Sequence, residues 1–253
     1  MIHTTKRGQF WPGVDTPHPH ARIWGGESIK ASSGGDCTTG FAIGLQDGRQ
    51  GFLTAGHCFD PTRPANQQQT RTFDGRTMTG VEYNHGPSDW GIYTLDKTTD
   101  EAVGVIDTET GEHSVRAVAS PTLDMPICKT GTTTETTCGK ITLLDTTVVT
   151  HPIYDANGTM VAPSKVLRGM IMSDLCSEGG DSGAPVYTDP AGVQNAPIDA
   201  VGTVTGGLTQ PDANGNEVCL ERLDGPGASV AFAVPLAAIS AASTNPFSIK
   251  TGG

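Results

Sequence analysis

The sequence predicts an all-β protein with a single helix near its C-terminus. Short runs of β-branched and other apolar residues recur along the chain, and clusters of glycine, proline, aspartate and asparagine separate them. The 253 residues include 33 glycines, while aromatic residues make up 6% and charged residues 17% of the chain. This composition fits many short strands and turns better than a helical bundle. The length fits one domain with two subdomains, or two small domains.

The first strands are expected in a hairpin, because the apolar runs 41–45 and 51–54 flank a turn sequence at 46–49. Residues 1–22 are rich in proline, lack any strand or helix period and are expected to form a flexible arm. Residues 96–114 are polar and are predicted to form a surface loop that contains at most a short strand at 103–106. Further strands are expected around residues 71–73, 78–83, 90–95 and 115–118.

The second half begins after residues 121–126, which are expected to form the crossover between the halves. The predicted helix covers residues 235–242, where Pro235 suits a first helical turn and alanine-rich helix formers follow. More strands are expected at residues 147–151, 166–172, 184–187, 200–204 and 229–234.

The charge balance excludes several classes of partner. A net charge of −11 without a basic tract argues against nucleic acid and anionic membranes, because both reward lysine and arginine. No stretch approaches the roughly 20 apolar residues of a membrane span. No signal peptide is visible near residue 1, and we interpret the sequence as a processed form of an exported protein.

Six cysteines indicate disulfide bonds: Cys37, Cys58, Cys128, Cys138, Cys176 and Cys219. An even number without a Cys-x-x-Cys pair favours disulfides over a zinc site, and such bonds imply an oxidising compartment. The residues alone leave the pairing open, since six cysteines allow about 15 connectivities.

The segment Cys176-Ser177-Glu178-Gly179-Gly180-Asp181-Ser182-Gly183-Ala184-Pro185 is the strongest candidate for a reactive site. A serine hydroxyl is a weak nucleophile and needs a base from elsewhere in the chain. His57, in Thr54-Ala55-Gly56-His57-Cys58, is the candidate base. Asp89, which precedes an apolar strand, is favoured over Asp96 and Asp107 as the carboxylate that orients the base, whereas the nearby His85 is expected to be solvated.

The order of His57, Asp89 and Ser182 and their local sequences resemble the chymotrypsin-like serine proteases, and more closely their secreted bacterial branch, the alpha-lytic protease and streptogrisin group. The resemblance implies two packed six-stranded antiparallel Greek-key β-barrels and a C-terminal helix. It also implies an N-terminal extension or pro-region remnant (1–22), a first barrel with His57 and Asp89 (23–120), and a second barrel with Ser182 and the helix (121–253).

The resemblance assigns Ser182 as the nucleophile, His57 as the general base, Asp89 as its orienting acid, and the N–H groups of Gly180 and Ser182 as the oxyanion hole. It also implies that Asp181 is buried and forms an ion pair with Lys129. That position carries arginine in the bacterial branch, so the lysine is a departure from the family pattern. The implied disulfides are Cys37–Cys58, Cys128–Cys138 and Cys176–Cys219.

The resemblance places the substrate-binding pocket at two segments, represented by Asp174, Leu175 and Ser177 and by Val204, Thr205, Gly206 and Gly207. The Thr205 hydroxyl would support Asp89. Val204 would make one wall apolar, which favours small or apolar residues before the cleaved bond. Asp174 keeps an alternative open, because an aspartate at the pocket floor would select lysine or arginine.

These features together predict a secreted, monomeric serine endopeptidase that acts on polypeptides without a cofactor or metal. The segment around Asp212 imitates a calcium loop, but its glycine and glutamate positions do not fit one. The alternative is a protease-like module that serves in binding or adhesion with weak or no catalysis.

Overall fold

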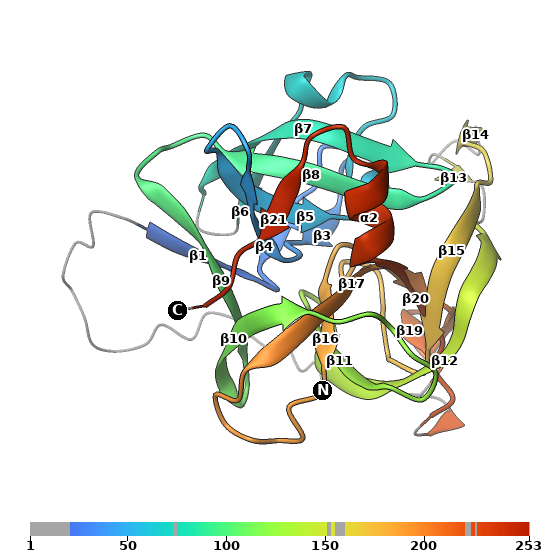
Figure 1. Cartoon of the computed structure of the whole chain (residues 1–253). Helices are drawn as coiled ribbons and strands as arrows, with labels where there is room; N and C mark the ends of the chain where they lie inside the picture. The colour runs from blue at the N-terminus through green and yellow to red at the C-terminus, as the bar shows by residue number, and fades with distance from the viewer. Residues whose placement is uncertain are drawn as a thin grey trace.

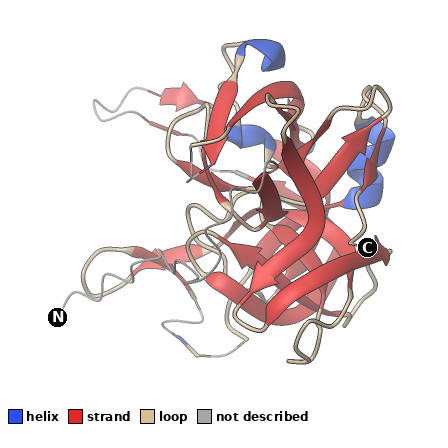
Figure 2. Cartoon of the chain, turned by 90° about the vertical axis from the view of Figure 1, so that its left-hand side faces the viewer, coloured by secondary structure: helices blue, strands red, loops and turns tan. Residues whose placement is uncertain are grey.

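Strands are the main secondary structure in the computed structural model, which describes residues 21–72, 75–150, 153–154, 160–220, 224–225 and 227–252 (Figure 2). Most of the expected N-terminal arm lies outside the described residues. The predicted helix is present as α2 (Leu236–Ala242), although Pro235 ends the preceding strand and caps the helix instead of lying in its first turn. No helix in the described ranges has the length and apolarity needed to span a membrane.

The first half of the fold is an eight-stranded antiparallel sheet in the order β21-β4-β5-β8-β7-β6-β2-β3 (Figure 1). The expected hairpin at 41–54 is formed by β4 and β5. The strands are β2 (Ser28–Lys30), β3 (Asp36–Thr38), β4 (Ala42–Leu45), β5 (Gln50–Thr54), β6 (Gln69–Thr72), β7 (Thr77–His85), β8 (Asp89–Leu95) and β21 (Phe247–Ile249).

The second half contains a closed barrel of six antiparallel strands (Figure 1). Its ring runs β11-β12-β15-β20-β17-β16 and closes because β16 also pairs with β11. The strands are β11 (Pro126–Gly131), β12 (Glu135–Val149), β15 (Val166–Ser173), β16 (Pro185–Thr188), β17 (Ile198–Gly207) and β20 (Ala231–Pro235). The predicted all-β fold class, with two packed β-units and a short helix near the C-terminus, is confirmed. The first unit has eight paired strands where the resemblance implies six.

The surface loop predicted at 96–114 is wrong, because this region forms most of a long hairpin of β9 (Asp100–Thr108) and β10 (Gly111–Val118). β9 also pairs in parallel with β1 (Ala21–Gly25), and β10 pairs in parallel with β17 of the barrel. Residues 102–106 are therefore buried, while the polar residues that suggested a loop lie toward the strand ends.

The remaining elements are short. Two 3₁₀ turns, η1 (Gly56–Cys58) and η2 (Ala65–Gln67), follow β5. Two small ribbons complete the described strands: β13 (Ile153–Tyr154) with β14 (Met160–Ala162), and β18 (Thr209–Pro211) with β19 (Glu217–Cys219).

A single apolar cluster spans the interface between the halves. It joins Phe41, Leu53 and Trp90 of the first half to Tyr187 and Val234 of the second, and all five are almost completely buried. Burial of this kind favours association of the halves by roughly 25 cal/mol per Å² of apolar surface. The shared core thereby fixes the relative position of any residues that meet across the interface.

Candidate active site

Three of the candidate side chains form one continuous hydrogen-bonded row across the interface. His57 Nδ1 lies 2.8 Å from Asp89 Oδ2, and His57 Nε2 lies 2.8 Å from Ser182 Oγ. The backbone N–H of His57 donates a further hydrogen bond of 2.8 Å to Asp89 Oδ1. His57 and Asp89 belong to the first half and Ser182 to the second, so the row depends on the packing of the two halves.

Neighbouring strands bring His57 and Asp89 together. β5 ends at Thr54 and leads into η1, which carries His57, while Asp89 begins β8, the antiparallel partner of β5. Gly56 makes this approach possible, because a Cβ there would lie 1.9 Å from the Asn84 carbonyl oxygen and 3.0 Å from Asp89 Oδ1. A larger residue at position 56 would therefore clash with the backbone of β7 at Asn84 and crowd the Asp89 carboxylate.

The electrostatics of the row favour an ionised carboxylate beside a basic imidazole. Burial of Asp89, which is 0% exposed, would raise the pKa of its carboxyl, but the His57 charge and hydrogen bonds outweigh this and lower it. Burial would lower the pKa of His57, yet the attraction and hydrogen bond of Asp89 raise it above its usual value. Asp89 therefore holds the proton on Nδ1 and leaves Nε2 as the acceptor for the Ser182 hydroxyl.

Ser182 lies between β15 and β16 in a segment whose backbone requires glycine. Gly180 and Gly183 have φ values of +104° and +92°, and a Cβ on Gly183 would lie 2.2 Å from Thr54 Oγ1. Within the described residues, the backbone N–H groups of Gly180 and Ser182 donate to no protein acceptor. Both amides are therefore free to bind a ligand oxygen.

Asp181 and Lys129 form a fully buried ion pair, as the sequence predicts. Lys129 Nζ lies 3.1 Å from Asp181 Oδ2, and both side chains are 0% exposed. The other carboxylate oxygen accepts hydrogen bonds from the backbone N–H groups of Thr133 and Thr134, at 2.8 and 3.1 Å. Burial would raise the pKa of Asp181, but the charge of Lys129 and the hydrogen bonds from the Thr134 hydroxyl and from the N–H groups of Glu178 and Thr133 lower it. For Lys129, burial prevails and lowers the pKa of the ammonium.

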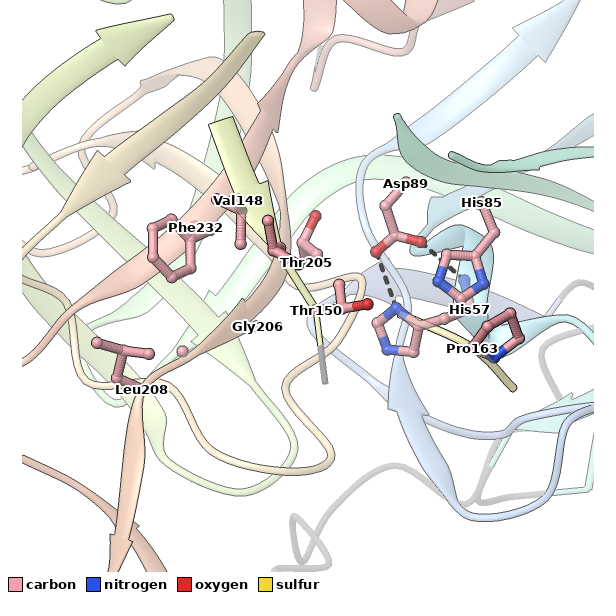
Figure 3. A pocket seen from close by; sticks show the side chains of 12 residues that line it. His57, His85, Asp89, Val148, Thr150, Pro163, Thr205, Gly206, Leu208 and Phe232 are labelled. Atoms are coloured by element: carbon pink, nitrogen blue, oxygen red, sulfur yellow. Dashed lines mark hydrogen bonds and ion pairs between the residues drawn. The ribbon is translucent and has the colours of Figure 1, made fainter. Parts of the chain in front are cut away.

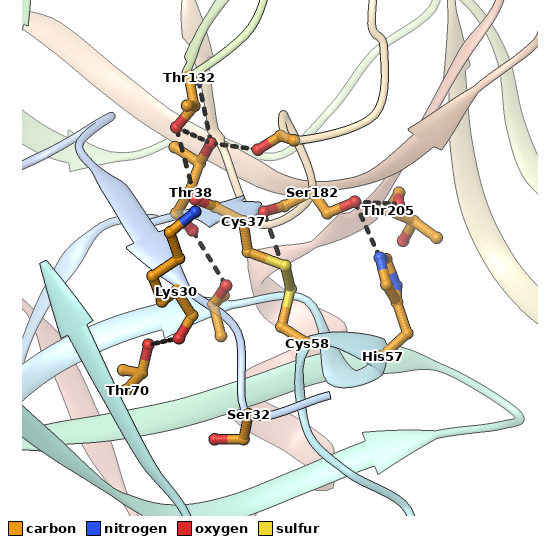
Figure 4. The surroundings of a disulfide bond; sticks show 12 residues. Lys30, Ser32, Cys37, Thr38, His57, Cys58, Thr70, Thr132, Ser182 and Thr205 are labelled. Carbon is orange, nitrogen blue, oxygen red and sulfur yellow. Dashed lines mark hydrogen bonds between the residues drawn. A yellow bond between two sulfur atoms is a disulfide. The ribbon is translucent and has the colours of Figure 1, made fainter. Parts of the chain in front are cut away.

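The structure contains the three disulfides that the resemblance implies: Cys37–Cys58, Cys128–Cys138 and Cys176–Cys219. Two of them adjoin the hydrogen-bonded row. Cys37–Cys58 joins β3 to the turn that carries His57, next to Ser182 (Figure 4). Cys176–Cys219 joins the segment before Ser182 to β19.

A cleft of about 280 Å³ opens beside His57 and Asp89. Its histidine end contains His57 and His85, and its apolar end contains Val148, Leu208 and Phe232 (Figure 3). The remaining lining residues are Val149, Thr150, Pro163, Thr205, Gly206 and Gly207. The cleft therefore offers an extended, mainly apolar surface that begins at the candidate base.

His85 lines the cleft, although the sequence predicts that it is solvated. The prediction that it is solvated fails, because it ends β7 opposite Asp89, is half-buried, and lies with its ring centroid 5.8 Å from that of His57. Burial lowers the pKa of His85; the negative charge of Asp89 opposes this, and the positive charges of His57 and Lys165 add to the lowering. The sequence predicts this strand only over 78–83, so it did not indicate that the strand continues to His85.

The predicted pocket residues divide into two groups. Thr205, Gly206 and Gly207 line the cleft. Leu175 and Val204, by contrast, are almost completely buried in the core of the second barrel and do not line the cleft. Ser177 is also buried and lies beneath Gly207, where a Cβ on the glycine would come 2.6 Å from the Ser177 carbonyl oxygen.

Two expectations about polar groups of the pocket are not met. Asp174 does not line the cleft; its carboxylate accepts a hydrogen bond of 2.5 Å from the backbone N–H of Lys140 on β12. The Thr205 hydroxyl does not support Asp89, since within the described residues it has no hydrogen-bond partner. Asp89 instead accepts hydrogen bonds of 2.8 Å from the backbone N–H and from Nδ1 of His57.

The described residues provide no convincing metal centre. Three groups of potential ligands lie close enough together to hold a metal ion, but each group contains both cysteines of a disulfide. A disulfide sulfur is not the thiolate that binds a metal ion.

Comparison with known proteins agrees with this geometry. Streptogrisin-C from Streptomyces griseus is 30% identical over 173 residues, a match that covers 67% of this chain and 34% of the relative. Streptogrisin-D from the same organism is 30% identical over 171 residues, covering 65% of this chain and 38% of the relative. The matched region thus spans little more than a third of the length of these relatives.

The fold is shared with Thermobifida fusca protease A, at a TM-score of 0.65 and 22% identity over 92% of this chain and 100% of that one. The trypsin family profile matches residues 15–220, which is well over half of the chain. This range contains His57, Asp89, Ser182 and all six cysteines. The chain belongs to the trypsin family.

Proposed function

We propose that this protein is a secreted serine endopeptidase that cleaves peptide bonds through an acyl-enzyme. The observation that carries the proposal is the unbroken row Asp89–His57–Ser182, in which both side-chain contacts measure 2.8 Å. A serine hydroxyl becomes an effective nucleophile when a base in hydrogen-bond contact removes its proton.

Acylation follows from this arrangement. Ser182 Oγ attacks the carbonyl carbon of the scissile bond while its proton moves to His57 Nε2. Asp89 stabilises the imidazolium, and the free N–H groups of Gly180 and Ser182 stabilise the negative oxygen of the tetrahedral intermediate. When the intermediate collapses, the C–N bond breaks and His57 gives its proton to the leaving amine.

Deacylation repeats the same steps with water as the nucleophile. His57 removes a proton from the water as its oxygen attacks the acyl carbon, and the same two amides stabilise the second oxyanion. The C–Oγ bond then breaks, and His57 returns its proton to Ser182. The peptide acid leaves and the free enzyme is restored.

The peptide substrate would lie along the end of β17. β16 pairs with β17 as far as Pro185–Thr203, and Gly183 and Ala184 extend the backbone hydrogen bonds to Val204, whereas β20 covers the other edge as far as Gly207. Thr205–Gly207 thus offers an edge to an extended peptide, which binds such an edge by adding a strand. The side chains of the residues before the cleaved bond would then meet the cleft.

The lining supports a preference for small or apolar residues before the cleaved bond. Val148, Leu208 and Phe232 form the apolar end of the cleft. The alternative preference for lysine or arginine has less support, because the Asp174 carboxylate is engaged by Lys140 on β12. Secretion as a monomer is part of the proposal, and the three disulfides support export, since they persist in oxidising compartments.

Cleavage of an unbiased peptide mixture, analysed by mass spectrometry, tests this function. We expect cleavage after small or apolar residues by the wild type and none by Ser182→Ala. Cleavage after lysine or arginine would contradict the proposed preference for small or apolar residues. No cleavage by folded wild-type protein would contradict the proposal and favour a binding module.

A further inference from the structure

The segment before Ser182 contains two consecutive glycines whose peptide plane needs an external restraint. A Cβ on Gly179 would meet no atom within 4 Å, and Gly180 lies in the left-handed region with φ of +104°. Glycines populate many backbone conformations, so sterics alone fix the plane between them poorly. This plane carries the Gly180 N–H, one of the two donors proposed for the oxyanion hole.

Thr133 restrains this plane through its carbonyl. Its Oγ1 donates a hydrogen bond of 2.6 Å to the Gly179 carbonyl oxygen, and its own N–H is fixed by a bond of 2.8 Å to Asp181 Oδ1. A trans peptide is planar, and its C=O and N–H point in opposite directions. The hydroxyl that fixes the Gly179 oxygen therefore also fixes the direction of the Gly180 N–H.

Thr38 restrains the next plane from the other half of the molecule. Its Oγ1 donates a hydrogen bond of 2.8 Å to the Gly180 carbonyl oxygen and accepts one of 3.1 Å from the Thr132 N–H. Its backbone N–H also donates to the Ser182 carbonyl oxygen at 2.8 Å. Figure 4 shows Thr38 and Thr132 on one side of Ser182 and His57 on the other.

We propose that the hydroxyls of Thr133 and Thr38 are positioning groups: Thr133 holds the Gly179–Gly180 peptide and Thr38 holds the following Gly180–Asp181 peptide, so that the Gly180 N–H keeps the orientation needed for oxyanion stabilisation. The inference rests on the proposed endopeptidase function. Neither hydroxyl contacts the reacting atoms in the row of Asp89, His57 and Ser182. Their effect is to preorganise a donor, which avoids reorientation of the dipole during the reaction.

A purely structural role predicts a different result from a positioning role. Thr133 is exposed, so loss of its hydroxyl bond should change the stability of the fold little. Thr79 provides a matched control, because its Oγ1 donates a hydrogen bond of 2.7 Å to Asp96 Oδ1 at the opposite end of β7 from His85.

The experiment compares Thr133→Val with Thr133→Ser and Thr79→Val. We expect Thr133→Val to lower kcat about tenfold with little change in KM, which is less than the loss of about 10²–10³-fold caused by removing an oxyanion donor. Thr133→Ser should restore the rate, and Thr79→Val should match the wild type. The melting temperatures of Thr133→Val and Thr79→Val should be alike. Thr38→Val should also lower kcat.

Binding to two inhibitors gives a readout that does not depend on turnover. A peptide boronic acid forms an adduct with Ser182 that places an oxygen in the oxyanion hole, whereas the amine product of cleavage, which lies beyond the scissile bond, has no oxygen there. Thr133→Val should weaken boronate binding by about the same factor as kcat and leave product binding unchanged.

Two results would overturn the inference. The first is a Thr133→Val variant with wild-type kcat and boronate affinity. The second is an equal loss in Thr133→Val and Thr133→Ser, because the hydroxyl would then not be the cause. A folded wild type that neither cleaves peptides nor binds the boronate would instead refute the proposed function, and this inference with it.

Discussion

At the scale of single residues, the His57 imidazole determines how the activity depends on pH. It accepts the Ser182 proton only in its neutral form, and Asp89 raises its pKa above the ordinary value. We therefore expect kcat/KM to rise with pH through an apparent pKa above about 6.5. Rates measured on a peptide substrate from about pH 5 to about pH 9 test this. A flat profile over this range would contradict the assignment of His57 as the base.

The buried Lys129–Asp181 pair leads to a second prediction at this scale. Lys129→Met leaves the Asp181 carboxylate buried without its counter-charge, which should cost about 3–5 kcal/mol of stability. The double variant Lys129→Met/Asp181→Asn should lose less, since it buries no charge. Urea unfolding of both variants measures the difference. An equal loss in the two would show that the ion pair has no special role.

Local sequence identified the residues whose roles depend on short motifs. His57, Asp89 and Ser182 each lie in a distinctive segment, and in the structure His57 lies 2.8 Å from each of the other two side chains. Local sequence did not reveal the direction of a side chain. The Asp174 carboxylate turns to Lys140, and the Thr205 hydroxyl does not reach Asp89. The directions of these two side chains depend on packing between segments that lie far apart in the chain.

At the scale of elements, the strands were predictable where apolar residues dominate or alternate. The hairpin of β4 and β5 and the short helix α2 illustrate this. β9 was predicted at most as a short strand at 103–106, because polar residues at its ends flank the buried run at 102–106 and its parallel partner β1 lies far away in the sequence. The contribution of β12 to the cleft could likewise not be predicted, since residues 148–150 line the same cleft as His57 only in the folded molecule.

The disulfides should differ in their contribution because they close loops of different length. Cys176–Cys219 joins residues 43 positions apart, whereas Cys128–Cys138 joins residues 10 apart. Chain-entropy arguments then predict that replacing both cysteines of the first pair by serine costs about 1 kcal/mol more than the same change in the second. Denaturant unfolding of the two double variants tests the order. The reverse order would show that local packing outweighs loop closure.

At the scale of the whole molecule, the C-terminal segment binds the two halves together. After α2, which follows the last barrel strand, β21 pairs with β4 of the first half. Glu82 on β7 holds this C-terminal segment in place, through contacts that we call the Glu82 clamp. Its carboxylate accepts hydrogen bonds from the hydroxyl of Ser243 at 2.8 Å and from the N–H of Thr244 at 3.1 Å. The cleft between the halves thus depends on contacts well outside it.

Glu82 should make this clamp sensitive to acid. Burial would raise the pKa of its carboxyl, but the hydrogen bonds from residues 243–245 outweigh burial and lower it. The clamp therefore stabilises the fold above the ordinary pKa of about 4.3 and is lost as the pH falls through the lowered value. Glu82→Gln should lower the melting temperature near neutral pH and converge with the wild type in acid. A difference that persists unchanged in acid would contradict a charge-based clamp.

The most direct test of the whole account is labelling with a serine-directed fluorophosphonate, followed by intact mass and peptide mapping. The reagent reacts only where a nucleophile, its base and an oxyanion site are assembled across the interface. We predict one adduct, located on Ser182 and absent in His57→Ala. No adduct on folded wild-type protein, or an adduct on another residue, would contradict the account.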